Sequence, residues 1–359
     1  MGMDAAEVCV VIPTHNRRFE LAGAIDSVLG QSWPRCHALV VDDGSTDGTP
    51  QLMADRYGSN QRVRYVRQEQ NRGAASARNL GLAHARGNYI AFLDSDDRWK
   101  SWKLELQVAC LARLAGDGVG MIWCDMDAVD EQGLLVQERA MRSVFSAYHW
   151  FDQLELFPHE QPLTSLVPEV KDPGTATIVH WGDAYSQFVL GNLCQTSSVL
   201  LTRQRLLLTG RFDERLICAE DHEFHLRCAR AGPVALLDIP AVLYRQDSSD
   251  RVDAGRRLRG AENQLRTLLP VIEADRERIH IPEKMLRHRL AEAYAWAAEE
   301  NLDHGSAARA RRLCGTSLRY RPLKGRTWAV LFAASLEPQA RSTLRQAYRE
   351  LMRSVKGVH

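Results

Sequence analysis

The sequence predicts an α/β fold in which helices flank a mostly parallel β-sheet, followed by a C-terminal region that is entirely helical. Short apolar, β-branched runs alternate with segments of helical spacing over residues 8–125, which is typical of β–α–β units. From residue 255 onward only helical spacing remains. The 359 residues leave room for a large domain and an appendage. We therefore place two domains at residues 1–250 and 251–359.

The individual elements follow from local patterns, taken in chain order. Strands are predicted at residues 8–12, 38–41, 63–66, 89–93, 119–123, 197–201, 234–237 and 242–244, with a hairpin over 125–136. Helices are predicted at residues 21–29, 49–57, 74–85, 102–111 and 220–231, and beyond the domain boundary at 256–278, 284–303, 305–319 and 338–354. Residues 138–180 are irregular, aromatic-rich and contain four prolines. We interpret this long segment as a lid that faces the acceptor.

Composition excludes several classes of protein. The chain has 46 Lys and Arg against 45 Asp and Glu, a net charge of +1, so we expect no nucleic-acid partner. Its eight cysteines contain no C-x-x-C pair and no zinc-site spacing, which fits a reducing cytosol. No run approaches the roughly 18 apolar residues of a membrane span. We expect a cytoplasmic protein.

The end of the chain is strongly basic. Residues 309–359 contain twelve Lys or Arg and two Glu. Within them, the apolar segment 327–336 lies next to several of these cations. Two interpretations stay open: peripheral contact with an anionic membrane surface, or packing of these helices on the catalytic domain or on a second subunit of a homo-oligomer.

Polar residues follow three of the predicted parallel strands. They lie at residues 13–17, 42–45 and 94–97. In open α/β sheets, ligands bind beyond the carboxyl ends of the strands. The three polar segments therefore predict one ligand site at one edge of the sheet.

Three carboxylates end the fourth predicted strand, namely Asp94, Asp96 and Asp97. Crowded carboxylates repel each other and are costly to desolvate, so they need open water or a cation. Mg²⁺ or Mn²⁺ would suit, because both take oxygen ligands and share them with substrate phosphates. The alternative is a solvated acidic turn in which Asp97 caps the next helix.

Five ordered motifs resemble those of a known family. They are Val10-Val11-Ile12-Pro13-Thr14-His15-Asn16-Arg17, Val40-Val41-Asp42-Asp43-Gly44-Ser45-Thr46-Asp47, Asn71-Arg72-Gly73 with Ala77-Arg78-Asn79, Phe92-Leu93-Asp94-Ser95-Asp96-Asp97, and Ala219-Glu220-Asp221. Together they resemble the inverting glycosyltransferases of family 2, which have the Rossmann-like GT-A fold. The resemblance extends over residues 8–247 and leaves the C-terminal helices unmatched.

The resemblance implies a binding site for a nucleotide sugar. The residues expected to bind this donor are Pro13, Thr14, Asn16, Arg17, Asp43, Arg78, Asp94 and Ser95. Within this set, Thr14 and Asp43 would contact the nucleotide base, and a carboxylate that accepts the imino hydrogen of uracil favours a UDP-sugar. Alternatively, Asp43 forms a local turn with Gly44, and Arg78 is a solvated helix residue.

The resemblance also implies a metal site and a catalytic base. Asp94, Asp96 and Asp97 would hold Mn²⁺ or Mg²⁺ at the donor phosphates, and Asp221 would deprotonate the acceptor hydroxyl. A carboxylate with an ordinary pKa near 4 is a weak base, so Asp221 needs burial or acidic neighbours, which Glu220 and Glu223 can supply. Alternatively, Glu220 and Asp221 only favour the first turn of a helix.

One motif departs from the family pattern. Members often carry Tyr-Arg-x-His after the last core strand, and this chain has Tyr244-Arg245-Gln246-Asp247. Asp247 can replace the imidazole as a metal ligand, or Arg245 can hold the phosphates directly. The nearby His222 is expected to be solvated.

The expected function is therefore metal-dependent, inverting transfer of a sugar from a nucleoside diphosphate to an acceptor hydroxyl, in the synthesis of a surface glycan or glycoconjugate. The acceptor would be a glycan, a lipid-linked sugar or a small molecule. One alternative is a catalytically silent subunit that binds nucleotide sugars. Another is a sugar-nucleotide pyrophosphorylase, which would need a glycine-rich loop after the first strand; residues 13–16 contain no glycine.

Overall fold

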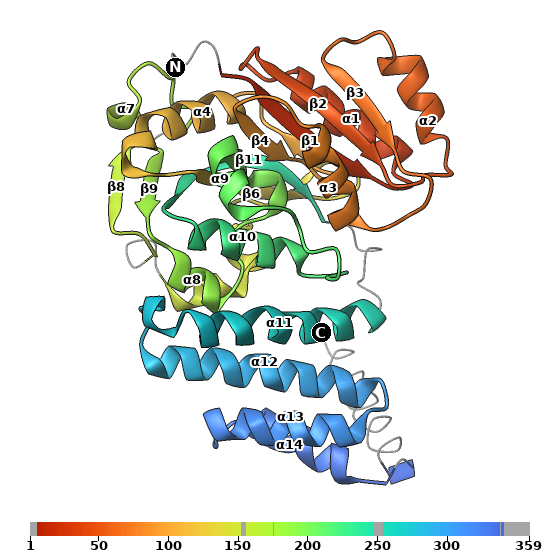
Figure 1. The fold of residues 1–359 in the computed structure, drawn as a ribbon, viewed down its shortest axis with the longest axis vertical. Helices are drawn as coiled ribbons and strands as arrows, with labels where there is room; N and C mark the ends of the chain where they lie inside the picture. The colour runs from red at the N-terminus through yellow and green to blue at the C-terminus, as the bar shows by residue number, and fades with distance from the viewer. Residues whose placement is uncertain (1–5, 152–155, 175, 247–253, 338, 341–359) are drawn as a thin grey trace. The chain divides into compact units, whose positions relative to one another are not determined.

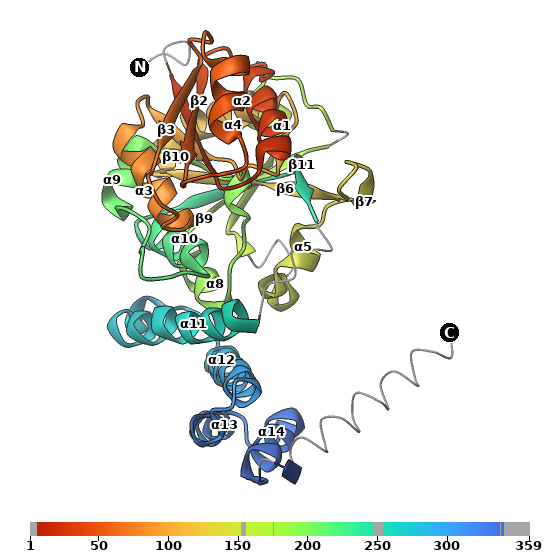
Figure 2. The same ribbon diagram turned by 90° about the vertical axis from the view of Figure 1, so that its right-hand side faces the viewer.

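A computed structural model of the chain describes residues 6–151, 156–174, 176–246, 254–337 and 339–340. The chain divides into two compact units, Met1–Arg251 and Val252–His359. Figures 1 and 2 show a sheet with flanking helices in the first unit and helices alone in the second.

The first unit is built on one mixed sheet with the strand order β3-β2-β1-β4-β10-β6-β11-β9-β8, to which β5 and β7 add by pairing with β11 and β6. Its strands are β1 (Val8–Thr14), β2 (Cys36–Asp42), β3 (Val63–Arg67), β4 (Tyr89–Phe92), β5 (Arg98–Trp99), β6 (Met121–Val129), β7 (Leu135–Gln137), β8 (His159–Pro162), β9 (Ile178–Gly182), β10 (Leu200–Thr202) and β11 (Val234–Arg245). Its helices are α1 (Arg18–Leu29), α2 (Thr49–Leu52), α3 (Ala74–His84), α4 (Lys103–Arg113), α5 (Met141–Val144), α7 (Leu163–Leu166), α8 (Tyr185–Leu190), α9 (Arg203–Thr209) and α10 (Glu220–Arg230), with shorter helical segments η2 (Met53–Tyr57), η3 (Leu114–Asp117), η4 (Ser146–Trp150) and η5 (Thr196–Ser198).

The half of the sheet that carries the predicted site is parallel. Strands β3, β2, β1 and β4 pair in parallel, and all seven residues of β1 are buried. Helix α3 lies so close to this sheet that a Cβ added at Gly81 would lie 2.3 Å from the side chain of Val11. Burial of both sheet faces explains the continuous apolar runs in the sequence.

The prediction of a mostly parallel sheet holds for this half but not for the other. Strand β10 is antiparallel to both β4 and β6, and β9 is antiparallel to β11. The strand predicted at residues 197–201 is also shorter, because Thr196–Ser198 forms the turn η5. The α/β class and the flanking helices are confirmed.

The prediction that residues 138–180 lack regular secondary structure is wrong. This segment contains α5, η4, β8 and α7, and β8 pairs with β9 at the edge of the sheet. Buried aromatic residues such as Tyr148 and Phe157 anchor it to the core. Whether any part of it faces an acceptor stays a prediction.

The second unit contains the helices α11 (Ala254–Ala274), α12 (Glu283–Asp303), α13 (Ala307–Tyr320) and α14 (Gly325–Ser335), with the short turn η6 (Arg276–Arg278). Figures 1 and 2 show α11 and α12 side by side. Helix α14 was not predicted as a helix, and nearly all of the helix predicted at 338–354 lies outside the described residues. Within the described ranges, no helix is both long and apolar enough to cross a bilayer.

Candidate active site

The loops after β1 and β2 are joined to each other. The backbone N–H of Asp43 donates to the carbonyl oxygen of Thr14 at 2.8 Å. The N–H of Asn16 donates to Oγ of Ser45 at 3.0 Å, and Oδ1 of Asn16 accepts from the N–H of Thr46 at 2.8 Å. Asn16 adopts a left-handed backbone conformation with φ of 52°, which asparagine tolerates better than most residues. The structure thus brings two of the predicted polar segments together.

Asp43 organises the start of helix α3. Its carboxylate accepts the N–H groups of Arg72 at 2.8 Å and Gly73 at 2.7 Å, and the side-chain amide of Gln68 at 2.7 Å. Asp43 therefore accepts more hydrogen bonds than a local turn with Gly44, the alternative interpretation, would give it. Beside it, Oγ1 of Thr14 is buried and has no hydrogen-bond partner within the described part of the chain. Because buried hydroxyls are normally paired, Thr14 has capacity left for a ligand.

Pro13 and Ser95 are buried next to these loops, at the end of β1 and after β4. Arg17 lies on the more open side, where its guanidinium is 3.8 Å from the carboxylate of Asp96. The residues predicted to bind the donor from the first, second and fourth strand ends therefore lie at one edge of the sheet. Their contacts with a donor stay a prediction.

Arg78 connects the carboxylates of two distant segments. Its guanidinium donates to Asp94 at 2.8 Å and to Glu220 at 2.9 Å, and it lies 5.4 Å from the ring centroid of Phe212. Burial alone would lower the pKa of Arg78, but Asp94 and Glu220 raise it. The alternative of a solvated helix arginine is wrong, because Arg78 is only 5% exposed.

An aromatic cluster below Arg78 holds helix α10 against strand β4. Phe92 ends β4, and its ring centroid lies 5.3 Å from that of Phe212 and 5.9 Å from that of Phe224 on α10. Phe212 and Phe224 stack with centroids 4.0 Å apart. Buried aromatic pairs of this kind contribute about 0.5–1.5 kcal/mol each beyond their buried area. The cluster therefore packs the helix that carries Asp221 against the strand that precedes Asp94.

Asp97 does not have the surroundings expected of a metal ligand. It is 1% exposed. One carboxylate oxygen accepts the hydroxyl of Ser197 at 2.6 Å, and the other accepts the backbone N–H of Arg245 at 3.0 Å. Burial raises the pKa of Asp97, and the charges of Asp94 and Asp96 raise it further. Asp97 therefore joins η5 and β11 to the acidic turn, and its role as a metal ligand stays a prediction.

The remaining carboxylates fit a divalent cation only in combination with substrate oxygens. Among the described residues, no three His, Cys, Asp or Glu side chains are arranged to hold a metal ion. Asp94 already accepts Arg78 and, at 3.2 Å, the amide of Gln195. Asp96 is partly exposed, and the guanidinium of Arg17 lies 3.8 Å from its carboxylate. Mg²⁺ is commonly held by one or two carboxylates plus phosphates, so Asp96 fits such an ion.

The end of β11 and the residues near it bear on the histidine that the Tyr-Arg-x-His motif lacks in this chain. Arg245 donates to Glu20 at 3.0 Å, so its guanidinium is already engaged in an ion pair. Asp247 lies outside the described residues. His222 is buried rather than solvated, and its Nε2 lies 2.8 Å from the carbonyl oxygen of Phe188.

Asp221 has the properties needed in a general base. It lies in the first turn of α10, two residues after Ala219, whose φ of 61° precedes the helix in a left-handed conformation. Burial raises the pKa of Asp221 to about 6, with Glu220 as the next cause. The acidic neighbour Glu223 plays no such part, because it pairs with Arg227 at 2.5 Å.

A second set of side chains orients Asp221. Asn192 donates from Nδ2 to the carboxylate of Asp221 at 3.0 Å, and Oδ1 of Asn192 lies 3.2 Å from Nδ1 of His225. Burial lowers the pKa of His225 to about 3, so the imidazole is neutral near pH 7. An N–H at Nδ1 would fix the direction of the Asn192 amide. Sequence reasoning missed the role of both residues, because Asn192 lies in the short connection between α8 and η5 without a recognisable motif.

The pH dependence of any reaction that uses Asp221 follows from these contacts. We expect activity to rise with pH through about 6, because the carboxylate must be ionised to accept a proton. Replacing Asn192 by alanine removes a donor to the charged form, so the pKa of Asp221 rises and the acid limb moves to higher pH. The C194A variant is the matched control, because Cys194 contacts the same His225 at 3.3 Å without touching Asp221. An unchanged acid limb in N192A would contradict the assigned orientation.

Comparison with known proteins shows which family the first part of the chain resembles. Residues 9–145 match the model of glycosyl transferase family 2. The putative teichuronic acid biosynthesis glycosyltransferase TuaG of Bacillus subtilis is 46% identical over 101 residues, which are 28% of this chain and 40% of TuaG. The UDP-Glc:alpha-D-GlcNAc-diphosphoundecaprenol beta-1,3-glucosyltransferase WfgD of Escherichia coli is 38% identical over 111 residues, which are 31% of this chain and 43% of WfgD. The matches thus span less than half of either relative.

Solved structures agree on the fold. Residues 1–349 of S. aureus TarS superimpose with a TM-score of 0.52 at 18% identity, covering 96% of this chain and 91% of that one. The mannosyltransferase PcManGT from Pyrobaculum calidifontis gives a TM-score of 0.52 at 20% identity, with 92% and 86% covered. These superpositions show that the chain shares the GT-A fold of these two proteins. The similarity to glycosyl transferase family 2 itself is carried by residues 9–145, which match the family model.

Proposed function

We propose that the protein transfers a sugar from a nucleoside diphosphate, with UDP as the nucleotide, to an acceptor hydroxyl with inversion at the anomeric carbon. The observation that carries this proposal is the bridge from Asp94 through Arg78 to Glu220. It connects the strand edge where a nucleotide sugar would bind to the helix turn that carries Asp221. UDP is preferred because WfgD, which is 38% identical over 111 residues, is named for a UDP-sugar donor.

The proposed reaction is a single displacement. Asp221 accepts the proton of the acceptor hydroxyl while that oxygen forms a bond to the anomeric carbon. The bond from this carbon to the diphosphate oxygen breaks at the same time, and its electron pair leaves with the nucleoside diphosphate. A divalent cation at Asp96, when bound, supplies charge neutralisation at the diphosphate oxygens. Thr14, Asn16 and Asp43 would position the nucleoside.

The raised pKa of Asp221 argues against a catalytically silent nucleotide-sugar binder. Burying a carboxylate beside Glu220 costs free energy, and a subunit that only binds a donor has no use for a base near pH 6. A pyrophosphorylase is disfavoured as well, because the loop after β1 contains Asn16 in place of a phosphate-binding glycine run.

Donor and metal binding can be measured without turnover. We expect UDP with Mn²⁺ to raise the melting temperature more than UDP alone, since a ligand at about 100 times its Kd stabilises the native state by about 2.7 kcal/mol. The D96N variant should lose the additional stabilisation by Mn²⁺. The exposed Asp117, which has no side-chain partner within the described ranges, supplies the control variant D117N. Equal stabilisation of D96N and the unmodified protein would contradict the role of Asp96.

We further propose that the acceptor is lipid-linked and is met at the inner face of the cell membrane. Helix α14 buries Ala334 and partly buries Val330 and Ala333 on one side, and Trp328 and Phe332 remain 52% and 63% exposed. Exposed aromatic residues beside cations are typical of a helix that lies on an anionic membrane.

The basic residues near α14 are partly neutralised within the unit. Lys324 pairs with Glu292 at 2.7 Å and Arg326 pairs with Glu299 at 2.6 Å. Arg312 and Arg319 are exposed and have no acidic partner among the residues described. The electrostatic contribution is therefore smaller than the number of basic residues implies, and the apolar side chains carry more of the proposed attachment.

Vesicle binding tests this attachment. We expect the protein to bind phosphatidylglycerol vesicles and to be released by salt, because roughly 1 kcal/mol per basic residue near the surface is screened. The W328A/F332A variant should bind at least tenfold more weakly. The matched control is L207A/L208A, which removes two leucines that are 77% and 67% exposed on α9. An equal loss of vesicle binding in both variants would show that the contact is unspecific and would contradict attachment through α14.

A further inference from the structure

A cavity lies at the edge of the sheet opposite the candidate active site. Its volume is about 710 Å³, and its walls come from the segments that precede four parallel strands. Glu7 precedes β1, Arg35 precedes β2, Arg62 precedes β3, and Arg86 precedes β4. The seven residues of β2 place this edge roughly 20 Å from the strand ends that carry the site, at about 3.3 Å per residue.

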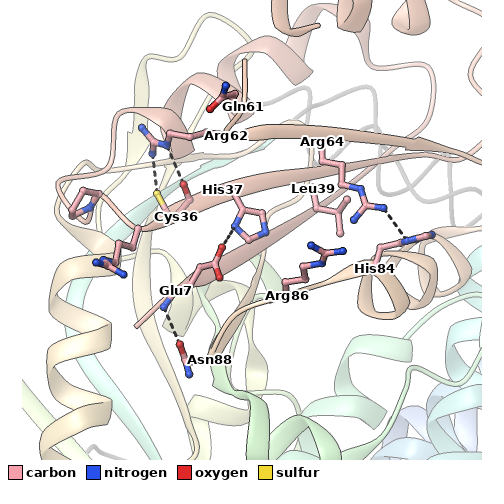
Figure 3. Close-up of a pocket in the computed structure, with 12 residues that line it drawn as sticks. Glu7, Cys36, His37, Leu39, Gln61, Arg62, Arg64, His84, Arg86 and Asn88 are labelled. Atoms are coloured by element: carbon pink, nitrogen blue, oxygen red, sulfur yellow. Dashed lines mark hydrogen bonds and ion pairs between the residues drawn. The ribbon is translucent and has the colours of Figure 1, made fainter. Parts of the chain in front are cut away.

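The cavity is strongly basic. Four arginines and two histidines line it with one carboxylate, Glu7, which gives a net charge of +3 with neutral histidines. Burial lowers the pKa of His37; Glu7 raises it, whereas Arg64 and Arg86 lower it. The positive potential of both arginines therefore reaches the cavity wall. Figure 3 shows Arg64 and Arg86 on either side of Leu39, close to His37.

The arginines of this cavity differ in what they already bind. Arg62 is structural, because it donates to the carbonyl oxygens of Cys36 and Leu29 at 3.0 and 3.1 Å. Arg64 is exposed and has one weak contact, with Nδ1 of His84 at 3.3 Å. Arg86 is exposed, and no partner of its guanidinium is found in the described part of the chain.

This arrangement has the features of an anion site. Arg64 and Arg86 converge on one hollow, where they repel each other unless an anion separates them. Their planar guanidinium groups match phosphate oxygens in a bidentate geometry. Leu39 is 1% exposed and gives the cavity an apolar floor, which lowers the local dielectric and strengthens ion pairing.

We propose that this cavity is a second binding site, separate from the donor site, for a multiply charged phosphate compound such as a diphosphate or triphosphate chain. Arg64 and Arg86 bind the phosphates, and His37 and His84 contribute further donors. The same phosphate chemistry is available from a free phosphate compound or from a lipid headgroup. The site is independent of whether Asp221 is a catalytic base.

Calorimetric titration of the full chain with inorganic pyrophosphate, at constant ionic strength, tests the proposal. We expect the R64A/R86A variant to bind pyrophosphate at least tenfold more weakly than the unmodified protein. The control is R266A, which removes one exposed arginine on α11 and should bind unchanged. Pyrophosphate bound only in the donor site would give equal affinity in R64A/R86A, and that result would overturn the proposal.

Two further measurements complete the test. The single variant R86E reverses one exposed charge and should also lose binding, so it keeps the test decisive if the double variant folds poorly. Vesicles of phosphatidic acid, whose headgroup is a phosphate monoester, compared with phosphatidylcholine, distinguish the sources of phosphate. Binding to the anionic vesicles that depends on Arg64 and Arg86, without binding of pyrophosphate, would assign the site to a lipid headgroup. Binding of neither probe would overturn the proposal.

Discussion

Replacing Asp221 by asparagine is expected to lower kcat by about 10²- to 10⁴-fold, the usual contribution of a general base, while UDP binding is retained. Asparagine keeps the shape of the side chain and the hydrogen bond from Asn192, but it cannot accept the proton of the acceptor. The measurement is sugar transfer under saturating donor and acceptor, together with calorimetric titration of UDP.

The D221N variant also has a defined effect on folding. The carboxylate is penalised by burial, which raises its pKa to about 6, so removal of the charge should not lower the free energy of unfolding at pH 8. A loss of activity that accompanied a large loss of stability would therefore point to misfolding. Unchanged transfer and unchanged donor hydrolysis in a well-folded D221N would show that the base is another residue.

Replacing Arg78 by methionine is expected to destabilise the fold by about 3–5 kcal/mol, because removal of one partner leaves buried charges uncompensated. The charges left behind are those of Asp94 and Glu220. Urea unfolding at pH 8 measures this loss. The acid limb of activity should also move to higher pH, since the charge of Arg78 lowers the pKa of Asp221.

The control for this prediction is the double variant R78M/E220Q. It removes one of the two stranded carboxylates, so it should recover part of the lost stability. Substitution by lysine keeps the charge but not the forked guanidinium that reaches both carboxylates. The free energy of unfolding of R78K should therefore lie between those of R78M and the unmodified protein. If the losses of unfolding free energy in R78M and in E220Q simply add up in the double variant, the two side chains are not coupled in the native state.

Much of the fold and the position of the site could be predicted from the sequence because both depend on regular patterns. Continuous apolar runs identified β1, β2 and β4, and the rule for parallel sheets placed Asp43 and Asp94 at one edge. The short strand β10 could not be assigned a direction, since three residues carry no signal for antiparallel pairing. Helix α14 was missed because an apolar segment of its length is equally typical of a surface-bound segment.

The details of the site depend on contacts between residues far apart in the chain. Asp96 and Asp97 are adjacent, and the sequence does not say which one faces solvent. In the structure, Ser197 and the N–H of Arg245 bind Asp97 from 100 and 148 residues away. The position of Asn192 beside Asp221 likewise depends on tertiary folding. Such partners leave no local pattern in the sequence.

In the proposed mechanism, cation binding at the acidic turn is coupled to the ionisation of Asp221. The charge of Asp94 raises the pKa of Asp221, so a divalent cation bound with the donor beside Asp94 would lower that pKa. By thermodynamic linkage, protonation of Asp221 must then weaken donor binding by the same factor. The donor-bound enzyme would keep its base ionised at a lower pH than the free enzyme. The acid limb of kcat is therefore expected at lower pH than that of kcat/KM.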